Sequence, residues 1–109
     1  MSTKKSKPQV AFIYVVPDGD PTKHRATISK SAFLDLTIIG VKDYTQGAQV
    51  AKTLANQGVQ TIELCGGFGH AGAAKVSQAA GENVMVGVVR FDCHPSMGFK
   101  SGDQFFGAR

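Results

Sequence analysis

Thr61-Ile-Glu-Leu-Cys-Gly-Gly-Phe-Gly-His-Ala-Gly72 joins a short apolar strand to a helix through a glycine-rich turn. The pattern predicts a strand over 61–65 and a helix from about His70 to Ala80, which Gly81 ends. A further apolar strand is predicted over 84–91. Strand, helix and strand in this order are typical of a parallel pair joined by a right-handed crossover.

The same pattern extends toward the N-terminus. A strand over 33–41 precedes a helix that Asp43 caps and Gly58 ends, and the apolar stripe of this helix recurs at helical spacing. Val10-Ala-Phe-Ile-Tyr-Val-Val16 is a further strand, apolar on both sides. After it, we expect one short helix that starts at Pro21 with Asp20 as its N-cap. The strand over 84–91 is expected to be central, because it too is apolar on both sides.

The fold expected from these elements is an α/β domain with a four-stranded, mainly parallel sheet and two to three helices. The alternative is an α+β ferredoxin-like sandwich, which would scatter the strand ends to opposite edges. Two clear helices cannot cover both faces of such a sheet. We therefore predict that part of one face is left for a partner subunit, and that the chain is a homo-oligomer.

The positive charge of the chain is concentrated at its start. The 109 residues carry twelve Lys and Arg, eight Asp and Glu and a net charge of +4, but three lysines lie within residues 1–8. We predict a flexible basic tail over 1–8 and a single domain over 9–109, which is nearly neutral. This distribution argues against nucleic-acid binding. The apolar run at 10–16 is too short to export the chain or span a membrane, so a cytoplasmic location is expected.

The turn after the third predicted strand is a candidate anion site. Gly67-Phe-Gly-His-Ala-Gly72 is a literal G-x-G-x-x-G at a strand-to-helix junction, where backbone N–H groups and the helix dipole favour an anion. We expect ligand contacts from Gly66, Gly67, Gly69 and His70. Asp92 follows at the distance typical of a ribose-binding acid, yet a full dinucleotide fold needs more strands. Nucleotide binding, binding of another anion and a purely structural turn all remain open.

Polar residues at the predicted strand ends form the second candidate, because ligands bind outside the carboxyl ends of parallel strands. Glu63 lies within an apolar strand and needs a partner, for which Arg90 is the natural choice. This pair is either a structural ion pair, or a general base with a ligand clamp. Asp92 and His94, at the end of the last predicted strand, are candidates for proton transfer.

Cys65 is the boldest catalytic candidate. It lies beside a helix N-terminus, which activates a thiol, and His70 or His94 could serve as its base. The other interpretation is simple packing, since buried cysteine is a common small hydrophobe. The two cysteines, Cys65 and Cys93, are expected to be free thiols. His, Cys, Asp and Glu occur here in a spacing that matches no metal motif, so no metal site is predicted and the cofactor is unknown.

Five stretches resemble a family of small bacterial proteins classed as a domain of unknown function. The most specific are Glu-Leu-Cys-Gly-Gly-Phe-Gly at 63–69 and Arg-Phe-Asp-x-His-Pro at 90–95; the others are 15–18, 20–25 and 39–42. The resemblance covers nearly the whole chain beyond the tail. It implies no established activity and assigns no catalytic residue.

Taken together, the residues predict a protein that binds a small anionic or polar ligand at the carboxyl ends of its strands. The anionic group would contact Arg90 and the turn from Gly66 to Gly69, here called the glycine turn. The sequence does not decide whether binding is followed by catalysis. The competing interpretation is a non-catalytic oligomeric module, in which the same polar residues hold subunits together. Phe99, Phe105 and Phe106 in the C-terminal tail favour docking of that tail onto another surface.

Overall fold

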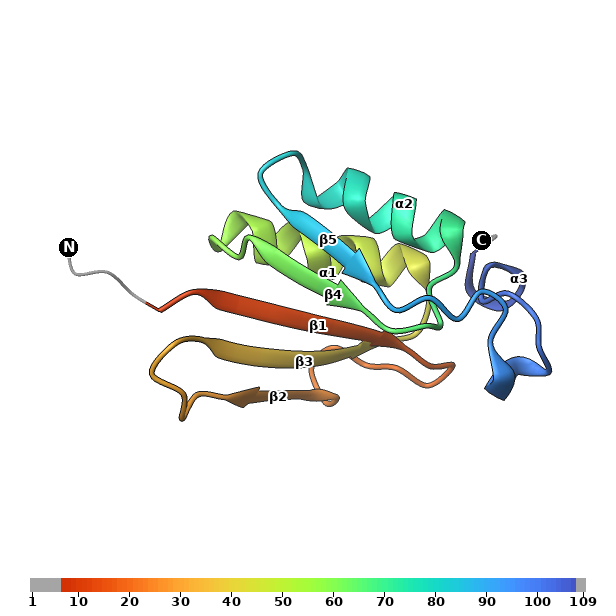
Figure 1. Ribbon diagram of the computed structural model, residues 1–109, viewed down its shortest axis with the longest axis horizontal. Helices are drawn as coiled ribbons and strands as arrows, with labels where there is room; N and C mark the ends of the chain where they lie inside the picture. Colours follow the sequence, from red (N-terminus) through yellow and green to blue (C-terminus); the bar gives the residue numbers. More distant parts are fainter. Residues whose placement is uncertain (1–6, 108–109) are drawn as a thin grey trace.

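The computed structural model describes residues 7–107, which fold into a sheet with helices packed against it (Figure 1). The elements in chain order are β1 (Gln9–Val15), β2 (Arg25–Ile28), β3 (Asp35–Val41), α1 (Tyr44–Asn56), β4 (Thr61–Leu64), α2 (His70–Ala80), β5 (Met85–Val88), the 3-10 turn η1 (Pro95–Met97) and α3 (Asp103–Phe106). No helix among these residues is long and apolar enough to cross a membrane.

The sheet has five strands in the order β2-β3-β1-β4-β5. β1 pairs in parallel with both β3 and β4, and β4 pairs in parallel with β5. Only β2, at one edge, is antiparallel to its neighbour β3. The predicted α/β class with a mainly parallel sheet is therefore confirmed, and the ferredoxin-like alternative is wrong. The sheet has five strands instead of the predicted four, because β2 adds an antiparallel edge strand.

The segment after β1 differs from the prediction. Asp20 caps a single turn, in which its Oδ1 accepts hydrogen bonds from the N–H of Thr22 at 2.9 Å and from the hydroxyl of Thr22 at 2.7 Å. The chain then extends into β2 instead of continuing as a helix. Arg25 to Ile28 pair with β3 through backbone hydrogen bonds, which replace the bonds that a short helix would have made.

The prediction of a central strand over 84–91 is wrong as well. β5 ends at Val88 and lies at the edge of the sheet, and β1 takes the central place. The apolar residues on both sides of β5 have different neighbours. Val86 and Val88 pack against the core, whereas Met85 is 66% exposed on the opposite side. An apolar pattern on both sides of a strand therefore did not require cover on both faces.

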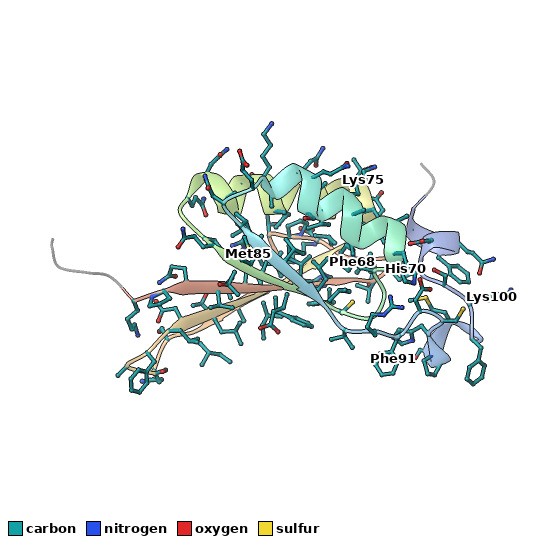
Figure 2. The ribbon with its side chains drawn as sticks, turned by 45° about the horizontal axis from the view of Figure 1, so that its top comes forward. Phe68, His70, Lys75, Met85, Phe91 and Lys100 are labelled. Atoms are coloured by element: carbon teal, nitrogen blue, oxygen red, sulfur yellow. The ribbon has the colours of Figure 1, made fainter. Side chains whose placement is uncertain are left out.

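Both long helices lie on the same face of the sheet and pack against each other (Figure 2). The crossover from β3 through α1 to β4 and the crossover from β4 through α2 to β5 move in the same direction along the sheet. Two right-handed crossovers in one direction place their helices on one face. The connection from β1 to β3 runs in the opposite direction, so a helix in it would have covered the other face. This connection contains the edge strand β2 and no long helix, so that face carries no helix.

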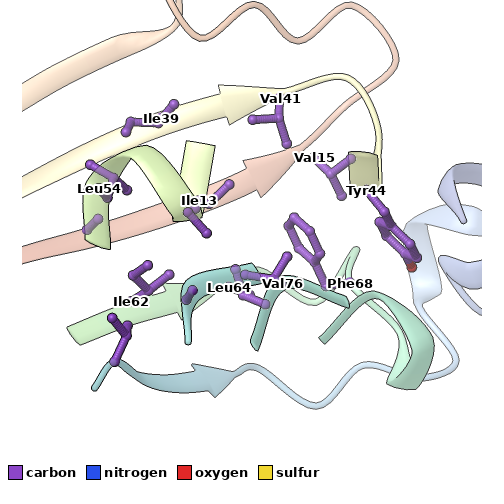
Figure 3. Packing of buried hydrophobic residues seen from close by; sticks show 14 of the residues in the cluster. Ile13, Val15, Ile39, Val41, Tyr44, Leu54, Ile62, Leu64, Phe68 and Val76 are labelled. Atoms are coloured by element: carbon purple, nitrogen blue, oxygen red, sulfur yellow. The ribbon is translucent and has the colours of Figure 1, made fainter. Parts of the chain in front are cut away.

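The core therefore lies between the sheet and one helical layer (Figure 3). In β1 the buried residues alternate with half-buried ones, as expected of a strand with one covered face. Phe68 comes from the glycine turn and is 2% exposed, and its ring stacks on Tyr44 of α1 with the centroids 5.3 Å apart. The glycine turn is thus anchored in the core by its one large side chain.

Residues at the N-terminal end of the described range contact the sheet. Lys7 forms a salt bridge with Asp35 at 2.8 Å, and the carbonyl of Pro8 accepts a hydrogen bond from the N–H of Asp35. The sequence assigned these two residues to the basic tail. The rest of that tail, residues 1–6, lies outside the described residues.

Replacing Phe68 by Ala is expected to lower the free energy of unfolding by about 3–5 kcal/mol, because a fully buried ring and its stacking partner are lost together. Denaturant titration followed by circular dichroism measures this change. Phe99→Ala is the matched control, since Phe99 is 75% exposed and should change stability by about 0.5 kcal/mol or less. Equal effects of the two substitutions would contradict the packing described for Phe68.

Candidate functional site

A cavity of about 900 Å³ opens at the carboxyl ends of β1, β3 and β4. After β1 the chain leaves toward β2 and β3, and after β4 it turns to the other side, so the loops diverge between these strands. Ligand sites of open parallel sheets occur where connections separate in this way. The cavity is lined by Tyr14, Val15, Val16, Pro17, Lys42, Asp43, Cys65, Gly67, His94, Ser96, Met97, Phe105 and Phe106.

The strand ends supply the floor of the cavity and three polar side chains. Lys42 and Asp43 follow β3, and Asp43 caps α1 by accepting a hydrogen bond from the N–H of Gln46 at 2.9 Å. Lys42 is exposed, and within residues 7–107 its ammonium has no salt-bridge partner. Cys65 follows β4 and is half-buried, and its Sγ accepts a hydrogen bond from the N–H of Gly67 at 3.3 Å.

Residues 94–107, here called the C-terminal segment, line the other side of the cavity. The Nδ1 of His94 accepts a hydrogen bond from the N–H of Ser96 at 3.0 Å, which places the ring proton on Nε2. His94 is thus a donor on the side of the ring away from η1. Phe106 is buried beside Tyr44, and Phe105 lines the cavity, as expected of phenylalanines that dock. Phe99 stays exposed.

Gly102 fixes the position of this segment against the glycine turn. A Cβ at residue 102 would overlap the carbonyl oxygen of Gly67, so the two backbones touch. Only glycine permits this approach. The glycine turn and the C-terminal segment therefore form one connected wall, although about thirty-five residues separate them in the chain.

The N-terminus of α2, predicted as an anion site, already holds two carboxylates of the chain. The Oδ2 of Asp103 accepts a hydrogen bond from Ala71 N–H at 3.1 Å, and its Oδ1 accepts from Gly72 N–H at 3.3 Å. The Oδ2 of Asp92 accepts from His70 N–H at 3.2 Å. These aspartates satisfy backbone groups that the N-cap, Gly69, cannot reach with a side chain.

Tyr44 completes this arrangement. Its hydroxyl donates to the Oδ1 of Asp103 at 2.8 Å and accepts from the N–H of Gly69 at 2.9 Å. Burial is the main cause that raises the pKa of the Tyr44 hydroxyl above its ordinary value, and the Asp103 carboxylate adds to it. The hydroxyl therefore stays protonated and serves as a structural donor.

His70, Arg90 and Asp92 gather beside the start of α2 and apart from the cavity. The Nε2 of His70 lies 3.3 Å from the Oδ2 of Asp92, and its Nδ1 lies 3.3 Å from the Nη1 of Arg90. His70 stands at the start of α2 in Figure 2, with 66% of its side chain exposed. None of the three side chains lines the cavity.

Glu63 lies elsewhere again. In β4 it alternates with the buried Ile62 and Leu64, so it is on the face of the sheet without helices, where it is exposed. The expected ion pair between Glu63 and Arg90 is not formed, because Arg90 follows the end of β5 and bonds to His70. The predicted site residues thus separate. Cys65, Gly67 and His94 line the cavity, and Gly69, His70, Arg90 and Asp92 lie at or beside the start of α2. Gly66 lies against the ring of Phe91, outside the cavity lining, and Glu63 lies on the open face.

Sequence reasoning missed Lys42, Tyr44 and Asp103. Lys42 stands directly after a predicted strand, so the strand-end rule could have included it. Gly69 at the predicted start of α2 was a signal for Asp103, because a helix without a capping side chain needs acceptors from elsewhere. Nothing in the sequence connected that need to Tyr44. In the part of the chain that the structure describes, no three His, Cys, Asp or Glu side chains are gathered to hold a metal ion.

Tyr44→Phe is expected to lower the free energy of unfolding by about 1–3 kcal/mol, because Gly69 N–H and Asp103 each lose a buried partner while the stacked ring is kept. Chemical denaturation measures the loss. Tyr14→Phe, which removes the same atom from a half-buried ring at the cavity, is the matched control. A stability unchanged in Tyr44→Phe would show that the hydroxyl does not hold the C-terminal segment.

The contacts of Asp92 predict that the free energy of unfolding decreases in acid. The hydroxyl of Ser101 is the main cause that lowers the pKa of Asp92 below its ordinary value of 3.8, followed by the N–H of His70. A lowered pKa stabilises the fold above the unfolded-state value, and the contribution is lost as the pH falls through the folded-state value. Unfolding measured between about pH 5 and pH 2 should therefore depend less steeply on pH in Asp92→Asn. An identical slope would rule out this role.

The comparisons with known proteins give a family and no activity. No curated protein and no solved structure shows significant similarity to the chain. A family model, described as a family of unknown function (DUF6506), matches residues 8–104 and so confirms the resemblance seen in the sequence. The chain belongs to this family of unknown function.

Proposed function

We propose that the protein binds a small molecule that has an acidic group and an apolar body, in the cavity at the carboxyl ends of β1, β3 and β4. The observation that carries the proposal is the cavity itself. Its volume of about 900 Å³ is in the range of small-molecule sites, and within residues 7–107 its lining combines apolar walls with Lys42, His94 and the helix-capping carboxylate of Asp43.

The lining residues suggest how such a ligand would be held. Lys42 supplies a positive charge and His94 supplies the N–H at Nε2, so a carboxylate or phosphate could be bound by both. The apolar walls come from β1 and from the C-terminal segment, and they include Met97 and Phe105. This assignment replaces the glycine turn as the anion contact, because the amides of His70, Ala71 and Gly72 that follow the turn are already bonded to Asp92 and Asp103, and Gly69 N–H is bonded to Tyr44.

Binding without catalysis is the function that the geometry supports best. Cys65 and His94 line the same cavity, but in residues 7–107 the hydrogen-bond partner of the Cys65 sulfur is the backbone of Gly67. A nucleophile needs its base within hydrogen-bond reach, at least when substrate is bound. Cys65 is therefore proposed as a wall of the site, and its nucleophilic role is left to the test below.

Thermal unfolding in the presence of aromatic and aliphatic carboxylates and phosphorylated metabolites tests the proposal. A ligand at a hundred times its Kd should stabilise the fold by about 2.7 kcal/mol and raise Tm. The neutral amide or alcohol of the same ligand should give a much smaller shift. Lys42→Met should abolish the shift that the acid gives.

Lys52→Met is the matched control, since Lys52 is an exposed lysine of α1 outside the cavity. Cys65→Ser should keep the shift, and a loss of substrate turnover in this variant alone would assign Cys65 a catalytic role. Two results would overturn the proposal: no member of the panel raises Tm, or the acid raises it equally in Lys42→Met and in the wild type.

A further inference from the structure

We propose that two copies of this chain associate through the face of the sheet that carries no helix, and that the two sheets stack with their strands nearly parallel. The inference is independent of the ligand. It begins with the side chains on that face, here called the open face. They are Ala26, Ile28, Leu36, Ile38, Val10, Phe12, Tyr14, Thr61, Glu63, Met85 and Gly87.

The register of the strands arranges these residues in rows across the sheet. One row runs through Ile28, Leu36, Val10, Thr61 and Met85. Its two ends are apolar and exposed, Ile28 at 56% and Met85 at 66%. In Figure 2, Met85 stands at the edge strand β5, on the far side of the sheet from β2. Apolar side chains thus occupy both edges and the centre of this row, with Thr61 as its one polar member.

The next row contains the one charged group of the open face. It runs through Ala26, Ile38, Phe12, Glu63 and Gly87. The residues at its ends are small, and nothing lies within 4 Å of the position that a Cβ of Gly87 would take. The carboxylate of Glu63 therefore lies beside an open channel at the edge of the sheet. Water can reach it there even when the middle of the face is covered.

The open face is large enough for a small dimer interface. Two strands of seven residues and three of four residues, about 4.8 Å apart with about 3.3 Å per residue, give a face of roughly 410 Å². Two such faces span about 820 Å² together before the relief of the side chains is counted, which is below the roughly 1,200 Å² of stable interfaces and indicates a weak, reversible dimer.

The composition favours a second copy over a different partner. Homodimer interfaces are more apolar than the rest of the protein surface, whereas interfaces between different, separately folded proteins are about as polar as that surface. The central residues of the open face are aliphatic or aromatic, and Val10, Phe12, Leu36 and Ile38 are only half-buried. Every copy leaves the same face uncovered, and a twofold stack covers both faces at once.

Glu63 decides the direction of the twofold axis. Glu63 is level with Phe12 on the central strand. An axis perpendicular to the strands would bring the two Glu63 carboxylates face to face, and their repulsion disfavours that arrangement. An axis along the strands reverses the strand order instead. It places Met85 of one copy over Ile28 of the other, as aligned sheet packing within about 30° allows.

Light scattering after size exclusion tests the dimer. The wild type should have twice the chain mass of 11.5 kDa, and its Tm should rise with protein concentration. Ile28→Lys and Met85→Lys should each weaken the dimer at least tenfold while circular dichroism shows an intact fold. Both side chains are exposed in one copy, so neither substitution disturbs the core.

Mixing two variants tests the direction of the axis. Met85→Glu and Ile28→Lys should each be monomeric alone. Mixed in equal amounts, they should form a heterodimer that contains one Lys–Glu contact and one unchanged pair of Met85 and Ile28. An antiparallel stack would give no such rescue, because Met85 would then lie over the other end of the partner's β5 and not over Ile28.

Phe99→Lys is the matched control, since Phe99 is 75% exposed and does not belong to the open face. It should leave the dimer unchanged. A monomeric wild type would overturn the proposal. A dimer sensitive to substitution at only one of Ile28 and Met85 would overturn it too, because that result indicates association through one edge strand.

Discussion

The bonding of the Asp103 carboxylate to the start of α2 is the contact on which the site depends. It joins three segments that are distant in the chain: Tyr44 on α1, the amides of Ala71 and Gly72, and the C-terminal segment. A helix whose N-cap is glycine has orphan N–H groups without a capping side chain, and a positive dipole end. Asp103 satisfies both needs, and in doing so it brings His94, Met97 and Phe105 over the strand ends. The cavity follows from this contact.

The same contact changes the meaning of the glycine turn. A G-x-G-x-x-G sequence presents amides to an anion only where those amides are free. Here two aspartates of the chain take the place that a phosphate would occupy. The turn serves to let Gly102 approach Gly67 and to bury Phe68. In the proposed function, recognition of an external ligand belongs to the neighbouring residues Lys42 and His94.

The handedness of the crossovers determines which face of the sheet the helices cover. Both helices follow connections in one direction, so both lie on one face. The connection from β1 to β3 contains a strand, because Asp20 ends its turn after a few residues and Arg25 to Ile28 pair with β3. The consequence is an uncovered apolar face, on which Glu63 lies. Glu63 is separate from Arg90 for another reason, because Arg90 lies past the end of β5 and contacts His70.

The sequence alone determined the elements whose signals are local. Apolar periodicity, Asp43 as a cap and Gly81 as a stop placed both long helices within a few residues, and the alternation of strands and helices predicted the parallel sheet. Tertiary structure decided what depends on partners distant in the chain. The edge strand β2, the place of β5 and the cap of α2 by Asp103 arise from pairing between segments that no periodicity connects. Backbone groups accept any suitable partner, so only the folded chain selects which one they receive.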